Sequence, residues 1–211
     1  RQEITVFDLV VNLPNKKKQI IKKIKIPLLG IHNIRNSVAA AAVALTVGIT
    51  IKDIKNGLLR FKGVQRRFNK IFTFNGVNFY DDYAHHPTEI KMVLDGVNEV
   101  YKDYEKVCVF QPHRISRLRD LRKEFSFAFQ KADIVILCPV YLAGEKIKLP
   151  FSYLKFAKEI IKNSKVKLFL IKDNIQLAKF IKRSIYGKKM VIGMGAGTIS
   201  NWMRKLPELM K

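Results

Sequence analysis

The chain has 211 residues, with 40 lysines and arginines against 17 aspartates and glutamates, and a formal net charge of +23. Apolar residues make up 48% of it, which excludes an intrinsically disordered chain. No apolar run is long enough to span a bilayer, and the two cysteines, Cys108 and Cys138, exclude a disulfide scaffold and a cysteine-based zinc site. We expect a globular protein that inserts into no membrane and lies in a reducing compartment, the cytoplasm.

The positive charge raises the alternative of a nucleic-acid-binding module, because basic surfaces attract phosphate backbones. The 29 lysines, however, are spread along the whole chain, and dense runs occur at 16–18 and 22–25. The sequence has no aromatic stacking motif, zinc-ligand spacing or helix-turn-helix pattern. The distribution of the lysines along the chain therefore favours a solvated basic surface over a nucleic-acid-binding stripe, and we expect no nucleic-acid partner.

The apolar pattern and the cap residues of segment 4–61 predict two strands followed by two helices. Gly30 opens the first helix, Gly48 ends it, and Thr50 caps the second. Because the chain begins at Arg1 inside a strand-like run, we expect it to be the tail of a longer protein. The predicted elements are strands at 4–11 and 19–29 with a turn at Pro14-Asn15, helices at 34–47 and 51–61, and a hinge at 61–68.

From residue 68 onward short apolar strands alternate with helices, which predicts βαβ units and a mostly parallel sheet. We therefore predict an α/β fold and place a domain boundary between residues 64 and 65. The predicted strands are 68–74, 77–80, 106–110, 133–140, 166–171 and 189–193, and the predicted helices are 88–100, 118–132, 152–162, 174–184 and one that begins at Ser200.

All four histidines lie in loops at strand ends or helix starts, where ligands bind in open α/β sheets. The first loop opens a helix with His32, Asn33 and, one turn later, Asn36. Free backbone N–H groups at a helix start favour an anion or a polar ligand, and these side chains suit a purine edge. The alternative is an asparagine-capped helix with a surface histidine.

The second loop, residues 81–89, follows a predicted strand and contains Asp81, Asp82, His85 and His86. Adjacent carboxylates suit ribose hydroxyls or a metal ion, and the histidines suit a metal ion or a carboxylate. The alternative is that Asp82 and Thr88 are only turn and cap residues.

The third loop, residues 111–119, contains His113, Arg114 and Arg117 and leads into a basic helix. The two arginines share one face if that helix starts early, and paired guanidinium groups suit bidentate binding of carboxylate or phosphate. The alternative is a solvated helix start. A glycine-rich turn at 193–197 is neither a dinucleotide fingerprint nor a Walker A sequence, and a tight turn is its simplest interpretation.

In this order the motifs resemble those of the Mur ligase family. They are Gly30-x-His32-Asn33-x-x-Asn36; Phe61-x-Gly63-Val64-x-Arg66-Arg67-Phe68; Asp81-Asp82-Tyr83-Ala84-His85-His86-Pro87-Thr88-Glu89; Val109-Phe110-Gln111-Pro112-His113-Arg114; Tyr141-x-Ala143-Gly144-Glu145; and Gly195-Ala196-Gly197. The first motif is shared across the family, whereas the third and fourth indicate the member that adds L-alanine to UDP-N-acetylmuramate in peptidoglycan synthesis. The alternative within the family is the member that adds a recycled peptide.

The resemblance implies an enzyme of three domains, of which this chain would contain two parts. Residues 1–64 would be the end of the central ATP-binding domain, and residues 65–211 the complete Rossmann-like C-terminal domain. ATP and Mg²⁺ are the implied cofactors, with the phosphate-binding loop and the magnesium ligands upstream of this chain, so that no metal ligand is expected within it. The fragment alone is expected to be inactive.

The resemblance also implies a role for each matching side chain. His32, Asn33 and Asn36 would contact adenine. Arg67 would reach the ATP phosphates, Asp82 would hold the ribose, and Tyr83 would lie near the nucleotide. His85, His113, Arg114 and Arg117 would bind L-alanine or the acyl-phosphate intermediate. Two positions depart from the family pattern: Ala84 replaces a usual glycine, and Ile115-Ser116 replaces Tyr-Thr.

Overall fold

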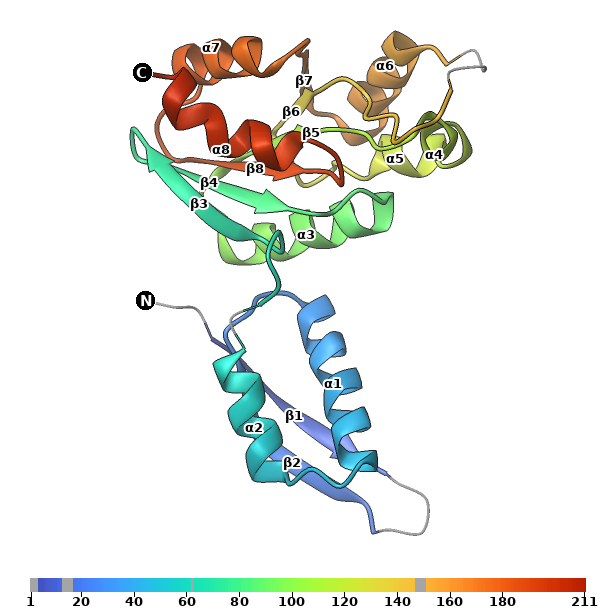
Figure 1. The fold of residues 1–211 in the computed structure, drawn as a ribbon, viewed down its shortest axis with the longest axis vertical. Coiled ribbons are helices and arrows are strands. Elements are labelled where there is room, and N and C mark those ends of the chain that lie inside the picture. The colour runs from blue at the N-terminus through green and yellow to red at the C-terminus, as the bar shows by residue number, and fades with distance from the viewer. Residues whose placement is uncertain (1–3, 13–16, 62, 147–150) are drawn as a thin grey trace. The chain divides into compact units, whose positions relative to one another are not determined.

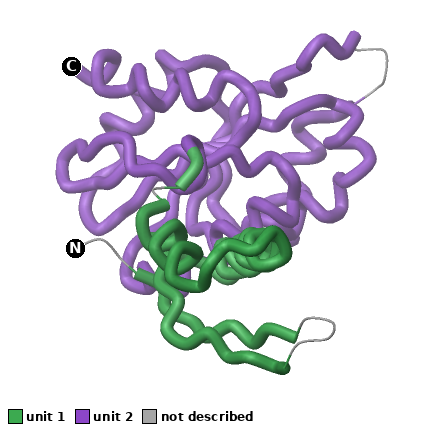
Figure 2. The backbone as a smooth tube through the Cα atoms, turned by 60° about the horizontal axis from the view of Figure 1, so that its bottom comes forward, with its two compact units in different colours: residues 1–64 green, residues 65–211 purple. Residues whose placement is uncertain are grey.

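The computed structural model describes residues 4–12, 17–61, 63–146 and 151–211. The chain divides into two compact units, unit 1 from Arg1 to Val64 and unit 2 from Gln65 to Lys211 (Figure 2). The division falls inside the predicted hinge, where Gly63, Arg66 and Phe68 all have positive φ. The turn predicted at Pro14-Asn15 lies outside the described residues.

Unit 1 pairs a two-stranded antiparallel sheet with two helices (Figure 1). Its elements are β1 (Thr5–Val11), β2 (Gln19–Ile26), α1 (Ile31–Thr46) and α2 (Ile51–Arg60). On β2 the side chains of Ile21, Ile24 and Ile26 are buried, and α2 packs against this strand. Helix α1 begins three residues earlier than predicted, because the Gly30 carbonyl accepts the N–H groups of Asn33 and Ile34.

Unit 2 contains a six-stranded sheet in the order β3-β4-β8-β5-β6-β7. The hairpin of β3 and β4 is antiparallel and turns at Asn75-Gly76, both with positive φ, whereas β4, β8, β5, β6 and β7 are parallel. The predicted mostly parallel sheet is therefore confirmed. Its strands are β3 (Asn69–Phe74), β4 (Val77–Asp82), β5 (Glu105–Phe110), β6 (Ile134–Leu137), β7 (Lys167–Leu170) and β8 (Lys189–Met194).

Helices cover both faces of this sheet, and each face has its own apolar core (Figure 1). One core contains Leu94, Phe125 and Phe156, from helices that follow β4, β5 and β6, and the other contains Leu177 and Met203, from helices that flank β8. The helices are α3 (Pro87–Val100), α4 (Ile115–Asp120), α5 (Arg122–Phe127), α6 (Tyr153–Ser164), α7 (Asn174–Ser184) and α8 (Ile199–Leu209).

The single basic helix predicted at 118–132 is wrong. The chain forms two short helices, α4 and α5, which meet at Leu121, where φ is −111° and ψ is 25°. Helix α5 ends early because the Phe129 N–H donates to Ser164 Oγ of α6 at 3.2 Å instead of continuing the helical ladder. This contact joins residues 35 positions apart in the sequence, so the local pattern did not indicate where α5 ends.

Within the described ranges, no helix combines the length and the apolar character that crossing a membrane requires.

Candidate functional site

Four loops of unit 2 meet at the carboxyl edge of the sheet, because parallel strands end together there. The loops follow β4, β8, β5 and β6 and begin near Tyr83, Gly195, Gln111 and Tyr141. Helices leave β5 and β8 toward opposite faces of the sheet, and the two strands are neighbours. Such a point, where adjacent connections diverge, is the usual ligand position of an open α/β sheet.

Gln111 joins the two diverging loops. Its N–H donates to the Met194 carbonyl at 3.0 Å, its Nε2 donates to Thr198 Oγ1 at 3.0 Å, and its Oε1 accepts the Ile199 N–H at 2.9 Å. A Cβ atom on Gly195 would lie 2.6 Å from the Gln111 carbonyl oxygen, and one on Gly197 would lie 2.6 Å from Tyr141 Cγ. The glycine-rich turn therefore permits close packing, as its simplest interpretation predicted.

A row of stacked and edge-on side chains crosses these loops. The Arg66 guanidinium lies 4.8 Å from the centre of the Tyr83 ring. The ring of Tyr83 is 5.1 Å from that of His85, His85 is 5.8 Å from His113, and His113 is 5.5 Å from Tyr141. The structure thus brings together Tyr83, His85 and His113, three predicted site residues from two loops.

His113 and Arg117 carry buried polar atoms without partners. His113 Nδ1 and Arg117 Nη1 form no hydrogen bond within the described part of the chain. Buried polar atoms in proteins are normally paired, because leaving one unpaired costs about 1–3 kcal/mol. Burial and the nearby Arg117 charge both lower the pKa of His113, which favours a neutral ring. The pair is suited to an anionic oxygen, which accepts from guanidinium and from an imidazole N–H.

Arg114 stands at the N-cap of α4, and the helix begins at Ile115. The early start therefore occurs, and it places Arg114 and Arg117 three residues apart around one turn. Arg114 has a φ of 67° and is exposed. Ile115 lacks the hydroxyl group of the usual tyrosine, whereas Ser116 keeps the hydroxyl group of the usual threonine, and its Oγ donates to Glu145.

The carboxylate of Asp82 is turned into the protein. It is 2% exposed, and its oxygens accept the N–H groups of Ala84 at 2.7 Å and of Phe68 at 2.8 Å. Burial raises the pKa of Asp82. In this structure Asp82 holds the loop after β4, and its contact with a ribose stays a prediction. Ala84 has a φ outside the left-handed region, which explains why a usual glycine is dispensable there.

Asp81, the other carboxylate of this loop, is fully buried. Ser200 Oγ donates to it at 2.5 Å, and Arg66 Nε and Arg204 Nη2 lie 3.6 Å and 3.5 Å from its oxygens. Arg66 also donates to the Gly195 carbonyl. Asp81 and Arg66 therefore join β4 to the turn after β8.

His85 and His86 are both held by Glu89 of α3. Glu89 Oε2 accepts the N–H groups of His85 at 3.0 Å and of His86 at 3.2 Å, and it lies 3.4 Å from His85 Nδ1. Burial acts to raise the pKa of Glu89, but the two backbone donors outweigh it and the pKa is lowered. His86 forms a capping box with Glu89, and Pro87 takes the first helical turn. His86 is thus a helix cap, and His85 is the histidine that faces the ring row.

Arg67 has an exposed side chain, and its N–H donates to Asn69 Oδ1 at 2.9 Å. Its charge acts on both Asp82 and Glu89, so it lies beside the loop after β4. The role of Arg67 toward phosphates stays a prediction.

In unit 1, the predicted nucleotide-contacting residues lie on the first turns of α1. Asn33 Nδ2 donates to the Leu29 carbonyl at 2.7 Å and so secures the helix start. A Cβ atom on Gly30, whose φ is 90°, would lie 2.8 Å from the His32 ring. His32 and Asn33 are half-buried and Asn36 is exposed. Their contact with adenine stays a prediction.

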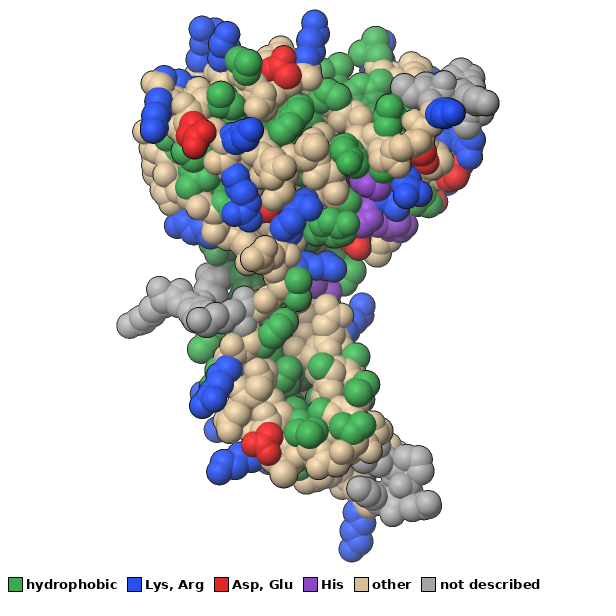
Figure 3. Space-filling model, viewed as in Figure 1, with side chains coloured by type: hydrophobic (Ala, Val, Ile, Leu, Met, Phe, Trp, Pro, Cys, Tyr) green, Lys and Arg blue, Asp and Glu red, His purple; other side chains and the backbone are tan. Residues whose placement is uncertain are grey.

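On the one face drawn in Figure 3, the described basic side chains form no stripe of the kind that binds nucleic acid. Figure 3 shows lysine and arginine side chains scattered over the visible face of both units, whereas histidines of unit 2 gather in one area. In the described residues, no group of three His, Cys, Asp or Glu side chains is placed to hold a metal ion.

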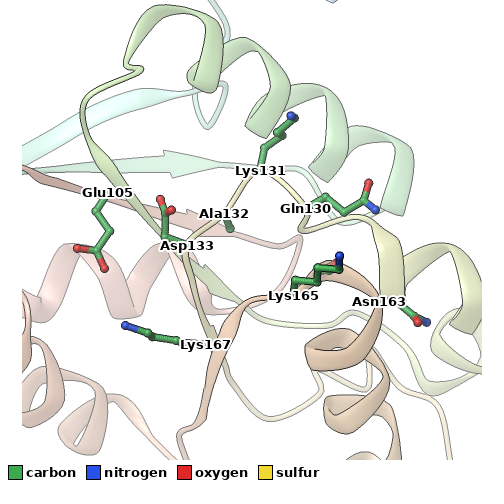
Figure 4. Close-up of a pocket in the computed structure, with 9 residues that line it drawn as sticks. Glu105, Gln130, Lys131, Ala132, Asp133, Asn163, Lys165 and Lys167 are labelled. Carbon is green, nitrogen blue, oxygen red and sulfur yellow. The ribbon is translucent and has the colours of Figure 1, made fainter.

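A hollow of about 640 Å³ lies elsewhere in unit 2, near the start of β5, β6 and β7 (Figure 4). It is lined by Glu105, Gln130, Lys131, Ala132, Asp133, Asn163, Ser164, Lys165 and Lys167. Its carboxylates have internal partners, because Lys189 pairs with Glu105 and the Lys106 N–H donates to Asp133 at 2.7 Å. None of the predicted site residues lines it.

Residues 66–197 match the family model described as "Mur ligase, glutamate ligase domain", which covers more than half of the chain. The chain belongs to the Mur ligase family. It is 68% identical over 208 residues to the UDP-N-acetylmuramate–L-alanine ligase of Pelagibacter ubique, covering 99% of this chain and 45% of that protein. To the ligase of the same name from Rickettsia bellii it is 41% identical, covering 97% and 44%. The chain thus spans under half the length of these curated relatives.

Solved structures show the same fold. The UDP-N-acetylmuramate–alanine ligase of Thermotoga maritima matches with a TM-score of 0.72 and 27% identity, over 90% of this chain and 42% of that one. A murein peptide ligase from Psychrobacter arcticus matches with a TM-score of 0.70 and 20% identity, over 96% and 42%. The resemblance read from the motifs is confirmed at the level of the family and the fold.

Three site residues carried no assigned role in the sequence interpretation: Tyr141, Glu145 and Arg66. Tyr141 and Glu145 follow β6, just as the histidine loops follow β4 and β5. Their position after a predicted strand was the available signal. Arg66 differs from its neighbour Arg67 in burial, which the sequence does not show.

Proposed function

We propose that this chain is the carboxyl-terminal part of an ATP-dependent ligase that joins L-alanine to UDP-N-acetylmuramate, in the cytoplasm, during peptidoglycan synthesis. Residues 1–64 are then the end of the central ATP-binding domain, and residues 65–211 the Rossmann-like ligase domain. The observation that carries the proposal is the turn at 113–117, which lies beside the ring of His85. There the buried His113 Nδ1 and Arg117 Nη1 have no hydrogen-bond partner in the described ranges.

The residues of this turn suit the amino-acid substrate. Arg114 and Arg117 offer guanidinium donors for its carboxylate or for a phosphate oxygen. His113 has a lowered pKa because of burial and the Arg117 charge, so at neutral pH it presents one donor and one acceptor nitrogen. Holding the carboxylate of L-alanine also orients its amine, which lowers the entropic cost of the attack by the amine on the activated carboxyl group of the sugar.

The nucleotide side of the proposal rests on other residues. His32, Asn33 and Asn36 would contact adenine, and Arg67, Asp82 and Tyr83 would hold phosphate and ribose. ATP supplies the phosphoryl group that converts the sugar carboxylate into an acyl phosphate. The amine nitrogen of L-alanine then bonds to the acyl carbon, the C–O bond to phosphate breaks, and the amine loses a proton to solvent. Mg²⁺ ligands are expected outside this chain.

The test is the full-length protein with Arg117→Ala or His113→Ala, assayed by L-alanine-dependent ADP release. We expect kcat/KM for L-alanine to fall roughly 100-fold, since losing a charge-assisted contact to a buried group costs up to about 3 kcal/mol. Arg119→Ala is the matched control, because Arg119 is exposed and pairs with Asp120, and it should retain turnover.

Unchanged turnover in both site variants would contradict the assignment. The same assay with a peptide in place of L-alanine separates the two family members. Turnover with peptide but not with L-alanine would favour the ligase that adds a recycled peptide.

A further inference from the structure

The loop after β6 places the carboxylate of Glu145 against the first turn of α4. Glu145 Oε2 accepts the N–H groups of Ile115 at 2.8 Å and of Ser116 at 3.2 Å, and Ser116 Oγ donates to Glu145 Oε1. One side chain thus receives three hydrogen bonds from two consecutive residues, 29 and 30 positions away in the sequence.

The backbone of the same loop is joined to the turn as well. The Tyr141 N–H donates to the Pro112 carbonyl, and the Arg114 N–H donates to the Tyr141 carbonyl, both at 2.8 Å. Ala143 and Gly144 then adopt positive φ values of 51° and 83°, which reverses the chain. This reversal brings the side chain of Glu145 back over α4.

Helix α4 needs an external cap. Its N-cap residue, Arg114, makes no side-chain cap hydrogen bond, and its first turn contains no acidic residue. Arg114 places positive charge at the positive end of the helix, which is unfavourable. Glu145 supplies both the missing acceptors and the opposing charge.

We propose that Glu145 is a positioning residue, which fixes the turn at 113–117 so that His113 and Arg117 present their unpartnered groups to the carboxylate of the amino-acid substrate. This inference rests on the proposed function. Glu145 forms no part of the ring row itself, and its contacts are to Ile115 and Ser116. The hydrogen bond from Ser116 lowers the pKa of Glu145, which keeps the carboxylate ionised at neutral pH.

The test compares Glu145→Gln and Glu145→Ala in the full-length protein. We expect the KM for L-alanine to rise about 10-fold for Gln, which removes the charge, and about 100-fold for Ala, which removes the charge and all three hydrogen bonds. The KM values for ATP and UDP-N-acetylmuramate should stay unchanged. Glu159→Gln is the matched control, because Glu159 is also a half-buried glutamate in an ion pair, with Arg122, and it should leave every KM unchanged.

A second measurement separates positioning from general support of the fold. If Glu145 acts through His113 and Arg117, then Glu145→Gln should raise the KM for L-alanine by a smaller factor in an Arg117→Ala background than in the wild-type protein. Ser116→Ala, which removes one of the three hydrogen bonds, should give a smaller rise in the same KM.

Three results would overturn the proposal: an unchanged KM for L-alanine in Glu145→Ala, additive effects in the double variant, or a parallel rise in all three KM values together with a lower melting temperature. Failure of the proposed function looks different, because Arg117→Ala would then itself leave the KM for L-alanine unchanged.

Discussion

At the scale of single residues, two atoms of unit 2, His113 Nδ1 and Arg117 Nη1, are buried without a hydrogen-bond partner among the residues that the structure describes. Protonating His113 would place a second positive charge beside Arg117, and burial already disfavours that form. The turn at 113–117 therefore contains a histidine whose neutral form is favoured and a guanidinium with a donor that has no partner among the described residues. Leaving these two atoms unpaired lowers the stability of the folded chain, and binding of an anionic oxygen to them would restore that stability.

The first prediction concerns the titration of His113 in this chain. Its pKa should lie below 6.5, the ordinary value, because burial and then Arg117 lower it. The unfolded chain then binds the proton more readily, so the contribution of His113 to stability is full above 6.5 and is lost as the pH falls below it. The measurement is an NMR titration of the ring proton, assigned with His113→Gln.

The matched pair for this titration is Arg117→Ala against Arg119→Ala. Removing Arg117 should raise the pKa of His113, whereas removing the exposed Arg119 should change it little. A midpoint at or above 6.5 in the wild-type chain would contradict the burial that the structure assigns to this ring.

At the scale of elements, caps supplied by neighbouring residues and loops decide where the helices near the site begin. Helix α3 starts at Pro87 because His86 and Glu89 exchange hydrogen bonds across its first turn. Helix α4 starts at Ile115, where Glu145 from the loop after β6 takes the place of a local cap. Local caps are visible in the sequence as spacing, whereas a cap from a distant loop is not.

The second prediction here concerns the capping box of α3. His86→Ala and Glu89→Gln should each lower the free energy of unfolding by ~1 kcal/mol, as lost caps do, measured by urea denaturation. Since the pKa of Glu89 is lowered in the folded state, its contribution is present above 4.5 and is lost as the pH falls. The control is Asp95→Asn, which removes the exposed ion pair with Lys91 on the same helix. It should change the free energy of unfolding by only a few tenths of a kcal/mol.

At the scale of the whole molecule, the two units differ in what they bury. Unit 2 has two apolar cores, one on each face of its sheet, and all their members lie between residues 65 and 211. Unit 1 buries five apolar side chains, Ile21, Ile24, Ile26, Ala41 and Ile54, among its described residues. Small units bury a smaller share of their surface on folding, so their stability is lower.

This contrast predicts that residues 65–211 fold cooperatively when expressed alone, whereas residues 1–64 do not. The measurement is circular dichroism with thermal melting of the two fragments beside the 211-residue chain. A non-cooperative melt of fragment 65–211 would contradict it.

The sequence by itself determined the class of fold, and it predicted the loops that contain the candidate site residues. Strand and helix periods are local properties, and motifs such as Gln111-Pro112-His113-Arg114 keep their spacing whatever surrounds them. The tertiary structure alone decided which way several side chains face: that Asp82 turns inward onto the Phe68 N–H group, that His85 joins the ring row, and that Glu145 caps α4. These contacts join residues that are far apart in the chain or on opposite sides of one backbone, so only packing of the sheet and its loops brings them into place.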